Sequence, residues 1–330
     1  MSKKILVIAE HEEGRIRRGS LEALAAARKL AQAWGGQVIG AVLAEQAGDL
    51  AEDFARKGAD EVVALEHPAL ARYTPDGYRQ AIAGLIAEIG PEWVLMAHTY
   101  LAQDMLPLVS SATGAPVLSD CVGVELDGER AIFLRQPYDA KFVARTVDNG
   151  PAPHFATLQS GAFPADELPE SPDTTVTTRT AAIDEAALRR KVLAVREVGD
   201  RTVDLSASEV VVAGGRGLGS KEKFEELVGS LASALGAAIG ASRPVVDSEW
   251  LPHAHQIGSS GQAITPKLYV ALGISGAIQH VVGIRGAQCI VAINRDKEAP
   301  IFNEATYGIV GDVAEVVPAL VTAIEEAKAQ

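Results

Sequence analysis

The chain has 330 residues, 48% of them hydrophobic and 22% charged, which is ample for two ordinary domain cores. With 43 acidic and 30 basic residues, its formal net charge is −13. Nucleic acid and anionic membrane surfaces are therefore repelled by the chain as a whole. Two cysteines, Cys121 and Cys289, are too few for a disulfide framework or a multi-thiolate metal site. We predict no metal and no nucleic-acid partner.

The apolar run near the start of the chain stops at Glu10. It is too short for the core of a signal peptide and far short of a membrane span. Together with the low cysteine count, this predicts a cytoplasmic protein without direct membrane insertion.

Short apolar runs alternate with longer amphipathic stretches over the first hundred residues. The runs are ILVIA at 5–9, VIGAVLA at 38–44, VVAL at 62–65 and WVLMA at 93–97, with helices expected over 19–34, 48–57 and 75–89. Near-continuous apolar strands indicate burial on both faces of a sheet. The pattern predicts a parallel sheet covered by helices.

The pattern changes after Asp120. Strands without helices are expected near 122–126, 131–134, 142–147 and 155–158. From 163 to 179 the chain has three prolines and four threonines with little apolar periodicity, which predicts an exposed connector.

A second α/β block begins near Leu205. Strands are expected at 210–213, 268–272 and 289–293, and helices at 221–235, 276–282 and 313–328. The sequence thus predicts an N-terminal parallel-sheet α/β domain with added strands over 1–162, a connector over 163–204 and a doubly wound α/β domain over 205–330.

The first strand leads into AEHEEGRIRRG, which lacks the glycine fingerprint of a dinucleotide-binding turn. His11 in this turn is interpreted as solvated or structural. A glycine-rich turn, AGGRGLGS at 213–220, does lie between a strand and a helix, where backbone N–H groups favour an anion. Its spacing does not match the fingerprint, so a ligand-free turn and a phosphate site with Arg216 stay open.

The strand LYVAL continues into another turn, with Gly273, Ser275 and Gly276 at the start of a helix. The Ser275 hydroxyl can cap that helix or contact a phosphate. Gln279 and His280, one turn later, face either a ligand or solvent. A metal role for His280 lacks partner ligands at suitable spacing, and no hydrolytic triad is recognisable.

A polar, glycine-rich stretch at 241–262 joins two apolar strands, and loops of this length in compact domains are usually functional. It offers hydroxyl, amide and guanidinium groups that suit a polar planar ligand. These are supplied by Ser242, Arg243, Gln256, Ser259 and Ser260.

The C-terminal block resembles the α subunit of electron transfer flavoproteins, the FixB-like family. The motifs that carry the resemblance are GGRGLG at 214–219, ASRPVVD at 241–247, QIGSSG at 256–261, LYVALGISGAIQH at 268–280, IVAINRD at 290–296, EAPIF at 298–302 and YGIVGD at 307–312. A looser N-terminal likeness involves LVIAEH at 6–11, Asp104, Asp120 and the stretch 137–141.

The resemblance implies a heterodimer with a β subunit, in which the C-terminal domain of this chain binds FAD and the N-terminal domain scaffolds the partner. It implies an arginine, Arg243, beside the isoalloxazine ring, the Ser260 hydroxyl at flavin N5 and His280 on the O2 side. The full set implied to line the site is Arg216, Ser242, Arg243, Ile257, Gly258, Ser259, Ser260, Ser275, Gly276, Ala277, Ile278, Gln279, His280, Asn294, Asp312 and Val313.

Four positions depart from the family pattern. Ser259 stands where many relatives have glutamine, Gln262 where a cation is common, Ala140 where glycine is usual and Gln159 where arginine is frequent. Loss of a cation at 262 weakens the positive field near the flavin, and these departures leave the donor and acceptor of this version open.

The function implied is that of an electron carrier without its own small-molecule substrate. It would pass electrons from flavin dehydrogenases, such as the acyl-CoA dehydrogenases of fatty-acid β-oxidation, to a quinone reductase or another acceptor. Two alternatives are a bifurcating, NADH-linked electron transfer flavoprotein and a non-redox adenine-nucleotide-binding protein.

Overall fold

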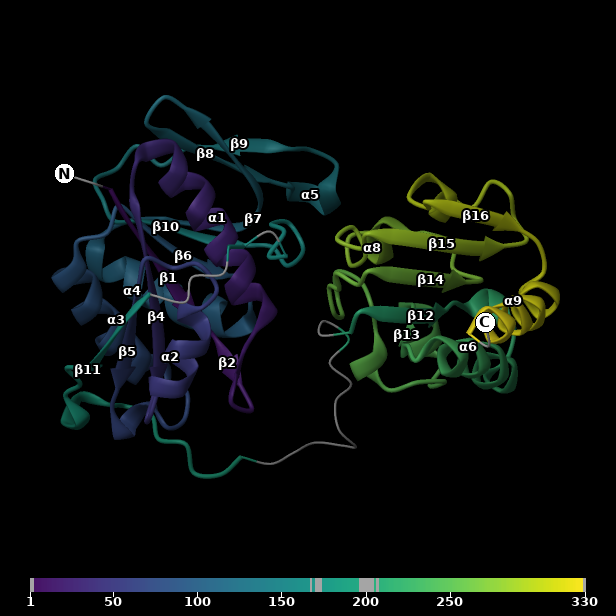
Figure 1. Cartoon of the computed structure of the whole chain (residues 1–330), viewed down its shortest axis with the longest axis horizontal. Helices are drawn as coiled ribbons and strands as arrows, with labels where there is room; N and C mark the ends of the chain where they lie inside the picture. Colours follow the sequence, from purple (N-terminus) through teal and green to yellow (C-terminus); the bar gives the residue numbers. More distant parts are fainter. Residues whose placement is uncertain (1–2, 167, 170–173, 196–204, 206–207, 329–330) are drawn as a thin grey trace. The chain divides into compact units, whose positions relative to one another are not determined.

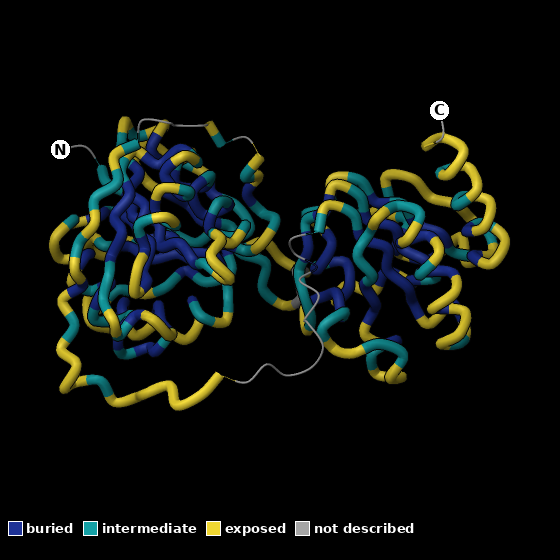
Figure 2. Tube along the Cα trace, turned by 60° about the horizontal axis from the view of Figure 1, so that its bottom comes forward, coloured by how far each residue is buried: buried dark blue, intermediate teal, exposed yellow. Residues whose placement is uncertain are grey.

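The computed structural model describes residues 3–166, 168–169, 174–195, 205 and 208–328 (Figure 1). The chain divides into two compact units, Met1–Arg196 and Glu197–Gln330. In each unit the buried residues form the interior and the exposed ones the outer turns and helix faces (Figure 2).

The first unit is built on a nine-stranded sheet in the order β11-β5-β4-β1-β6-β10-β7-β8-β9. Its strands are parallel from β11 to β7, and β8 and β9 continue the sheet antiparallel. The strands are β1 (Lys4–Ala9), β4 (Gln37–Ala44), β5 (Glu61–Glu66), β6 (Trp93–Ala97), β7 (Val117–Asp127), β8 (Arg130–Arg135), β9 (Ala144–Thr146), β10 (His154–Leu158) and β11 (Thr175–Thr180).

Helices cover both faces of this sheet. Buried side chains of α1 (Arg18–Trp34) and α2 (Gly48–Ala55) share one core with β1, β4 and β6, and those of α3 (Pro75–Ile89) and α4 (Tyr100–Thr113) share a second core on the opposite side. The continuous apolar strands predicted this arrangement, because a strand such as β1 buries its alternate side chains in both cores.

Two features of the first unit differ from the sequence-based expectation. Helix α4 was not expected, because its Pro107 and polar termini interrupt the periodic pattern. Strand β11 lies within the stretch expected to be an exposed connector, so that expectation is wrong for Thr175–Thr180. Its polar sequence TVTTRT pairs parallel with β5 at the edge of the sheet, where few apolar side chains are needed.

The second unit contains a five-stranded sheet in the order β13-β12-β14-β15-β16, and every neighbouring pair is parallel (Figure 1). This confirms the predicted α/β class for both parts of the chain. Strands β13 and β16 were not expected from the sequence. The strands are β12 (Val210–Gly214), β13 (Ala238–Ala241), β14 (Leu268–Leu272), β15 (Cys289–Asn294) and β16 (Tyr307–Val310).

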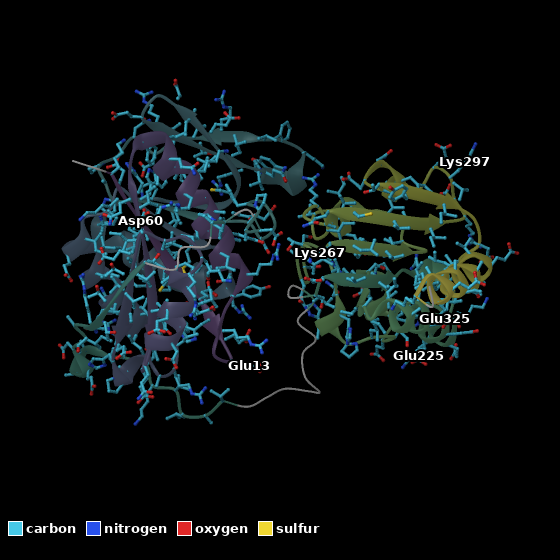
Figure 3. All side chains as sticks on the ribbon, in the orientation of Figure 1. Glu13, Asp60, Glu225, Lys267, Lys297 and Glu325 are labelled. Atoms are coloured by element: carbon cyan, nitrogen blue, oxygen red, sulfur yellow. The ribbon has the colours of Figure 1, made fainter. Side chains whose placement is uncertain are left out.

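The two faces of this sheet are covered differently. Helices α6 (Lys221–Leu235) and α9 (Val313–Lys328) pack on one face around a core that includes Phe224 and Val317. The other core, around Tyr269 and Ile284, is closed mainly by loop residues such as Ile257 and Ile301. Charged side chains such as Glu225, Lys267 and Glu325 lie exposed on the outside (Figure 3).

Short elements complete the described chain. They are β2 (His11–Glu12), β3 (Arg15–Ile16), α5 (Pro137–Ala140), α7 (Arg243–Asp247), α8 (Ile278–Val281) and the 3-10 turns η1 (Pro68–Leu70), η2 (Glu185–Ala187), η4 (Arg216–Leu218), η5 (His253–His255) and η6 (Pro300–Asn303). Among the described residues, no helix is both long enough and apolar enough to span a membrane.

Candidate functional site

The carboxyl ends of all five strands meet at one edge of the second unit's sheet, because the strands are parallel. Strand β12 is the first of the five in the chain, and it lies between β13 and β14. The connection from β12 leads to α6 on one face of the sheet, and the connection from the neighbouring β14 leads to α8 on the other face, so the switch point lies between β12 and β14. In open α/β sheets, ligands bind beyond the carboxyl ends of the strands at such a switch point.

Glycine residues hold the two turns at the switch point close together. The Gly217 N–H donates to the Gly273 carbonyl at 3.1 Å, and the Gly215 N–H donates to the Leu272 carbonyl at 2.8 Å. A Cβ atom on Gly215 or Gly217 would lie 2.3 or 2.5 Å from the Gly273 oxygen. Only residues without a side chain allow this approach.

Arg216 lies between these glycines, at the start of η4, and its side chain is exposed. In the part of the second unit that the structure describes, no ion pair is recorded for its guanidinium. An unpaired guanidinium presented on a rigid turn is suited to bind a phosphate oxygen.

The turn after β14 is fixed from the neighbouring elements. Asn294, at the end of β15, donates from Nδ2 to the Ile274 carbonyl at 2.9 Å, and the Ile301 N–H donates to the Ser275 carbonyl at 3.1 Å. Gly276 has φ +83°, and a Cβ atom there would lie 2.2 Å from the Ile301 nitrogen. The exposed Ser275 side chain is thus presented on a backbone with little freedom.

The turn after β13 is joined to its neighbours by backbone hydrogen bonds. The Ser242 N–H donates to the Gly214 carbonyl at 3.1 Å, and the Ile257 N–H donates to the Ala241 carbonyl at 2.9 Å. Arg243 follows Ser242 and is exposed, with Nε 3.4 Å from an Asp247 carboxylate oxygen. This edge therefore carries a second cation that is only loosely paired.

The 256–260 segment is fixed between α8 and its own side chains. The Ser259 N–H donates to the Gln279 carbonyl at 2.7 Å, and Gln256 Nε2 donates to the carbonyl and hydroxyl oxygens of Ser260 at 2.9 and 3.0 Å. Gly258 has φ +136°, where a Cβ atom would lie 2.5 Å from the Gln279 oxygen. The exposed Ser259 and Ser260 are held in place by these contacts.

The structure thus brings every sequence-predicted site residue to this edge or to the loop layer attached to it. Asp312 and Val313 begin α9 after β16, and Asp312 Oδ1 accepts from the Ala314 N–H at 2.9 Å. The exposed members are Arg216, Arg243, Ser259, Ser260, Ser275, Ala277, Ile278, Gln279 and Asp312, Asn294 is half-buried, and the buried ones are Ser242, Ile257, Gly258, Gly276, His280 and Val313. Contact of these residues with a ligand stays a prediction.

His280 is buried at 6% exposure, and both of its ring nitrogens have partners. Nδ1 lies 3.1 Å from the Ile257 carbonyl oxygen, and Nε2 lies 2.7 Å from the hydroxyl of Tyr269. Burial lowers the pKa of His280 to about 4, and the hydrogen bond to Ile257 opposes this only in part. Sequence reasoning missed Tyr269, although a tyrosine within the apolar run LYVAL signals a buried hydroxyl that needs a partner.

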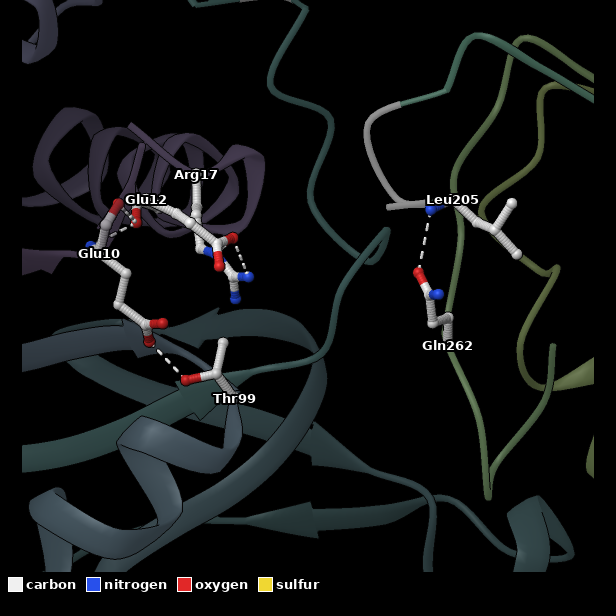
Figure 4. A network of polar contacts seen from close by, with 7 residues as sticks. Glu10, Glu12, Arg17, Thr99, Leu205 and Gln262 are labelled. Atoms are coloured by element: carbon white, nitrogen blue, oxygen red, sulfur yellow. Dashed lines mark hydrogen bonds and ion pairs between the residues drawn. The ribbon is translucent and has the colours of Figure 1, made fainter. Parts of the chain in front are cut away.

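Gln262 has a structural role in this chain. Its side-chain oxygen accepts from the Leu205 N–H at 3.0 Å (Figure 4), and its Nε2 donates to the Ala254 carbonyl. The amide therefore joins the start of the second unit to the 254–262 loop and contributes no charge.

The corresponding edge of the first unit has a different chemistry. Glu10 follows β1 at the switch point between β4 and β6, is 7% exposed and accepts a hydrogen bond from the Thr99 hydroxyl (Figure 4). Burial raises the pKa of Glu10, whereas the Thr99 hydrogen bond and Arg17 lower it. His11 contacts the Leu43 carbonyl at 2.9 Å, which agrees with a structural role. A buried carboxyl group disfavours a phosphate at this edge.

Comparison with known proteins agrees with the geometry. Residues 5–188 match the electron transfer flavoprotein domain, and residues 204–285 match the electron transfer flavoprotein FAD-binding domain. An electron transfer flavoprotein subunit alpha from Bacillus subtilis is 40% identical over 323 residues, which cover 97% of each chain. This chain belongs to the electron transfer flavoprotein alpha-subunit family.

Other relatives of this electron transfer flavoprotein chain carry different names. A protein FixB from Clostridium saccharobutylicum is 35% identical, with 98% of this chain and 97% of that one covered. An acryloyl-CoA reductase electron transfer subunit beta from Anaerotignum propionicum is 31% identical, with 99% and 96% covered.

The cofactor of the family is FAD, and the residues at the carboxyl edge fit it. A dinucleotide needs a cation and backbone N–H groups for its pyrophosphate and hydrogen-bonding groups for its ring, and the edge supplies both. The match to the FAD-binding domain includes the turns at 214–220 and 273–280 and the 256–260 segment. Asn294, Asp312 and Val313 lie beyond it, and only their position at the same edge connects them with the site. No cluster of three potential metal ligands occurs among the described side chains.

Proposed function

We propose that this chain, paired with a β subunit, binds FAD at the carboxyl edge of the β12–β16 sheet and carries electrons between two protein partners. The observation that supports this most is the convergence of three rigid turns with two exposed cations at the switch point of a parallel sheet. Bound FAD supplies the capacity to accept and release electrons one at a time.

In this proposal each group has a separate task. Arg216 and the backbone of the 214–220 turn bind the pyrophosphate, because an arginine fork and free N–H groups match its oxygens. Arg243 and the hydroxyl of Ser260 lie beside the ring, where a cation and a donor favour the electron-rich form over the oxidised one. The buried glycine contacts keep both groups in place, so little reorganisation accompanies electron transfer.

The β subunit is proposed as a permanent partner. Exposed apolar side chains on each unit support this, because monomeric proteins rarely expose such groups together. In the first unit Tyr138, Phe142 and Val143 are 76, 64 and 59% exposed, and in the second Tyr307 and Val310 are 66 and 60% exposed. A partner subunit would cover these side chains. The two cysteines are free thiols, which agrees with the cytoplasmic location we propose.

A flavoprotein dehydrogenase, for example one that acts on an acyl-CoA, is the proposed donor, and a quinone reductase or a comparable enzyme the acceptor. The net charge of −13 supports encounter with positively charged docking faces, and the rate of such an encounter falls with ionic strength. The chain itself would transform no small substrate.

Co-expression with a β subunit tests the proposal. A purified heterodimer with flavin absorbance, whose FAD affinity falls about 10- to 150-fold in an Arg216→Gln variant and is unchanged in a Lys297→Gln control, would support it. A folded heterodimer that is colourless after incubation with FAD and releases AMP would instead support the adenine-nucleotide-binding alternative. Two FAD molecules per dimer together with NADH oxidation would indicate the bifurcating form.

A further inference from the structure

The hydroxyl of Tyr269 is enclosed in the core of the second unit. Tyr269 is the second residue of β14 and is 0% exposed, and His280 of α8 packs over it with the ring centroids 6.1 Å apart. The Tyr269 hydroxyl lies 2.7 Å from His280 Nε2, an ordinary distance for a hydrogen bond from a hydroxyl group. A buried hydroxyl and a buried imidazole thus satisfy each other.

The partners on the two ring nitrogens determine where the imidazole proton lies. A carbonyl oxygen only accepts, so Nδ1 must carry the hydrogen that bonds to Ile257. In a neutral ring Nε2 is then an acceptor, and the Tyr269 hydroxyl is the donor. Burial raises the pKa of Tyr269, which keeps the phenol protonated and able to donate.

We propose that Tyr269 is a positioning residue that fixes His280 in the neutral Nδ1–H tautomer. With the protons placed in this way, the ring has no N–H left for any other acceptor. The opposite tautomer would set the Nδ1 lone pair against the Ile257 oxygen and leave the Tyr269 hydrogen without its acceptor.

The fixed tautomer also limits how His280 can act on the redox cofactor, a point that rests on the proposed function. If His280 lies beside the flavin ring, it does so as a neutral group whose donor capacity is already used. The stabilisation of the electron-rich flavin then depends on the cation of Arg243 and on hydroxyl or backbone donors. Loss of the Tyr269 hydroxyl would release Nε2 and let the ring present an N–H toward the flavin.

The test is ¹⁵N NMR of the FAD-loaded heterodimer, with ¹⁵N-labelled histidine in this chain alone. The signals that are missing in a His280→Gln variant are those of His280. The wild-type protein is expected to show a protonated Nδ1 and an unprotonated Nε2 that accepts a hydrogen bond. In Tyr269→Phe the Nε2 signal should move to the frequency of an unbonded ring nitrogen, and the ratio of Nδ1–H to Nε2–H should fall about fivefold, as expected for one lost hydrogen bond. Tyr100, in the first unit, is 87% exposed, and Tyr100→Phe is the matched control that should leave the His280 signals unchanged.

A second readout is the first one-electron potential of the flavin. It should rise in Tyr269→Phe, because a freed imidazole N–H can face the reduced ring, and stay at the wild-type value in Tyr100→Phe. A wild-type spectrum with a protonated Nε2 would overturn the inference without any variant. A Tyr269→Phe protein with the wild-type spectrum and potential would also overturn it. A heterodimer that binds no FAD would instead contradict the proposed function, because the tautomer can be measured without the cofactor.

Discussion

Replacement of Gly217 by alanine should disturb the switch point directly. The new Cβ would lie 2.5 Å from the Gly273 oxygen and 3.1 Å from two Gly273 carbons. Ordinary contact begins near 3.5 Å, so the two turns must separate by about 1 Å. That movement breaks the Gly217–Gly273 hydrogen bond, which contributes about 1 kcal/mol, and the remaining overlap costs a further ~1–3 kcal/mol.

The total of about 2–4 kcal/mol is divided between fold and cofactor. If the fold absorbs it, the free energy of unfolding falls by that amount. If the turn moves outward instead, FAD binding weakens by about tenfold for each 1.4 kcal/mol. The assay is FAD titration of the heterodimer by flavin fluorescence, together with urea unfolding of the same samples.

Gly229→Ala is the matched control. Gly229 lies inside α6, and a Cβ atom there meets nothing within 4 Å. We expect this variant to be more stable by about 0.5–1 kcal/mol, because alanine loses less backbone entropy in a helix. If Gly217→Ala binds FAD as tightly as the wild type and unfolds at the same urea concentration, the contact between the two turns supports neither the fold nor FAD binding.

Glu22 is 3% exposed, and burial raises its pKa from 4.5 to about 7. At a pH between these two values, the Glu22 carboxyl group is protonated in the folded state and ionised in the unfolded chain. Stability therefore falls by about 3 kcal/mol as the pH rises from 4.5 to 7, and urea unfolding at pH 5 and pH 8 should show this loss for the wild type but not for Glu22→Gln. Arg216→Gln should weaken FAD binding about 10- to 150-fold in the same titration, and an unchanged affinity would exclude a phosphate contact. Thr99 both caps α4 and donates to Glu10, so Thr99→Val should lower stability by about 2 kcal/mol while Thr99→Ser stays near the wild type.

Apolar periodicity predicted the fold where strands and helices bury wide faces. The predicted helix at 221–235 and the observed α6 agree because Ser220 accepts from the Lys223 N–H at 3.3 Å and Gly236 takes φ 66°, both readable as sequence signals. The edge strands β11, β13 and β16 were missed, whereas the edge strand β9 lies within the predicted 142–147. Strand β16, with sequence YGIV, is exposed along its whole length, so its apolar residues indicated no core position.

The site was predicted from turn chemistry and family likeness together. The glycines of the 213–220 turn left a ligand-free turn open, because sequence alone does not show that β12 and β14 are neighbours. The packing of Gly217 against Gly273 depends on that pairing across more than fifty residues. Tyr269 was missed for the same reason, since the partner of its hydroxyl comes from a helix on the face of the sheet.

Hydrogen–deuterium exchange of the heterodimer with and without FAD tests the position of the cofactor most directly. FAD at the carboxyl edge should slow exchange at 214–220, 257–260 and 275–280, and should leave the first unit's edge near Glu10 and Thr99 unchanged. Slower exchange near Glu10 and Thr99, with none in the three segments of the second unit, would contradict the account.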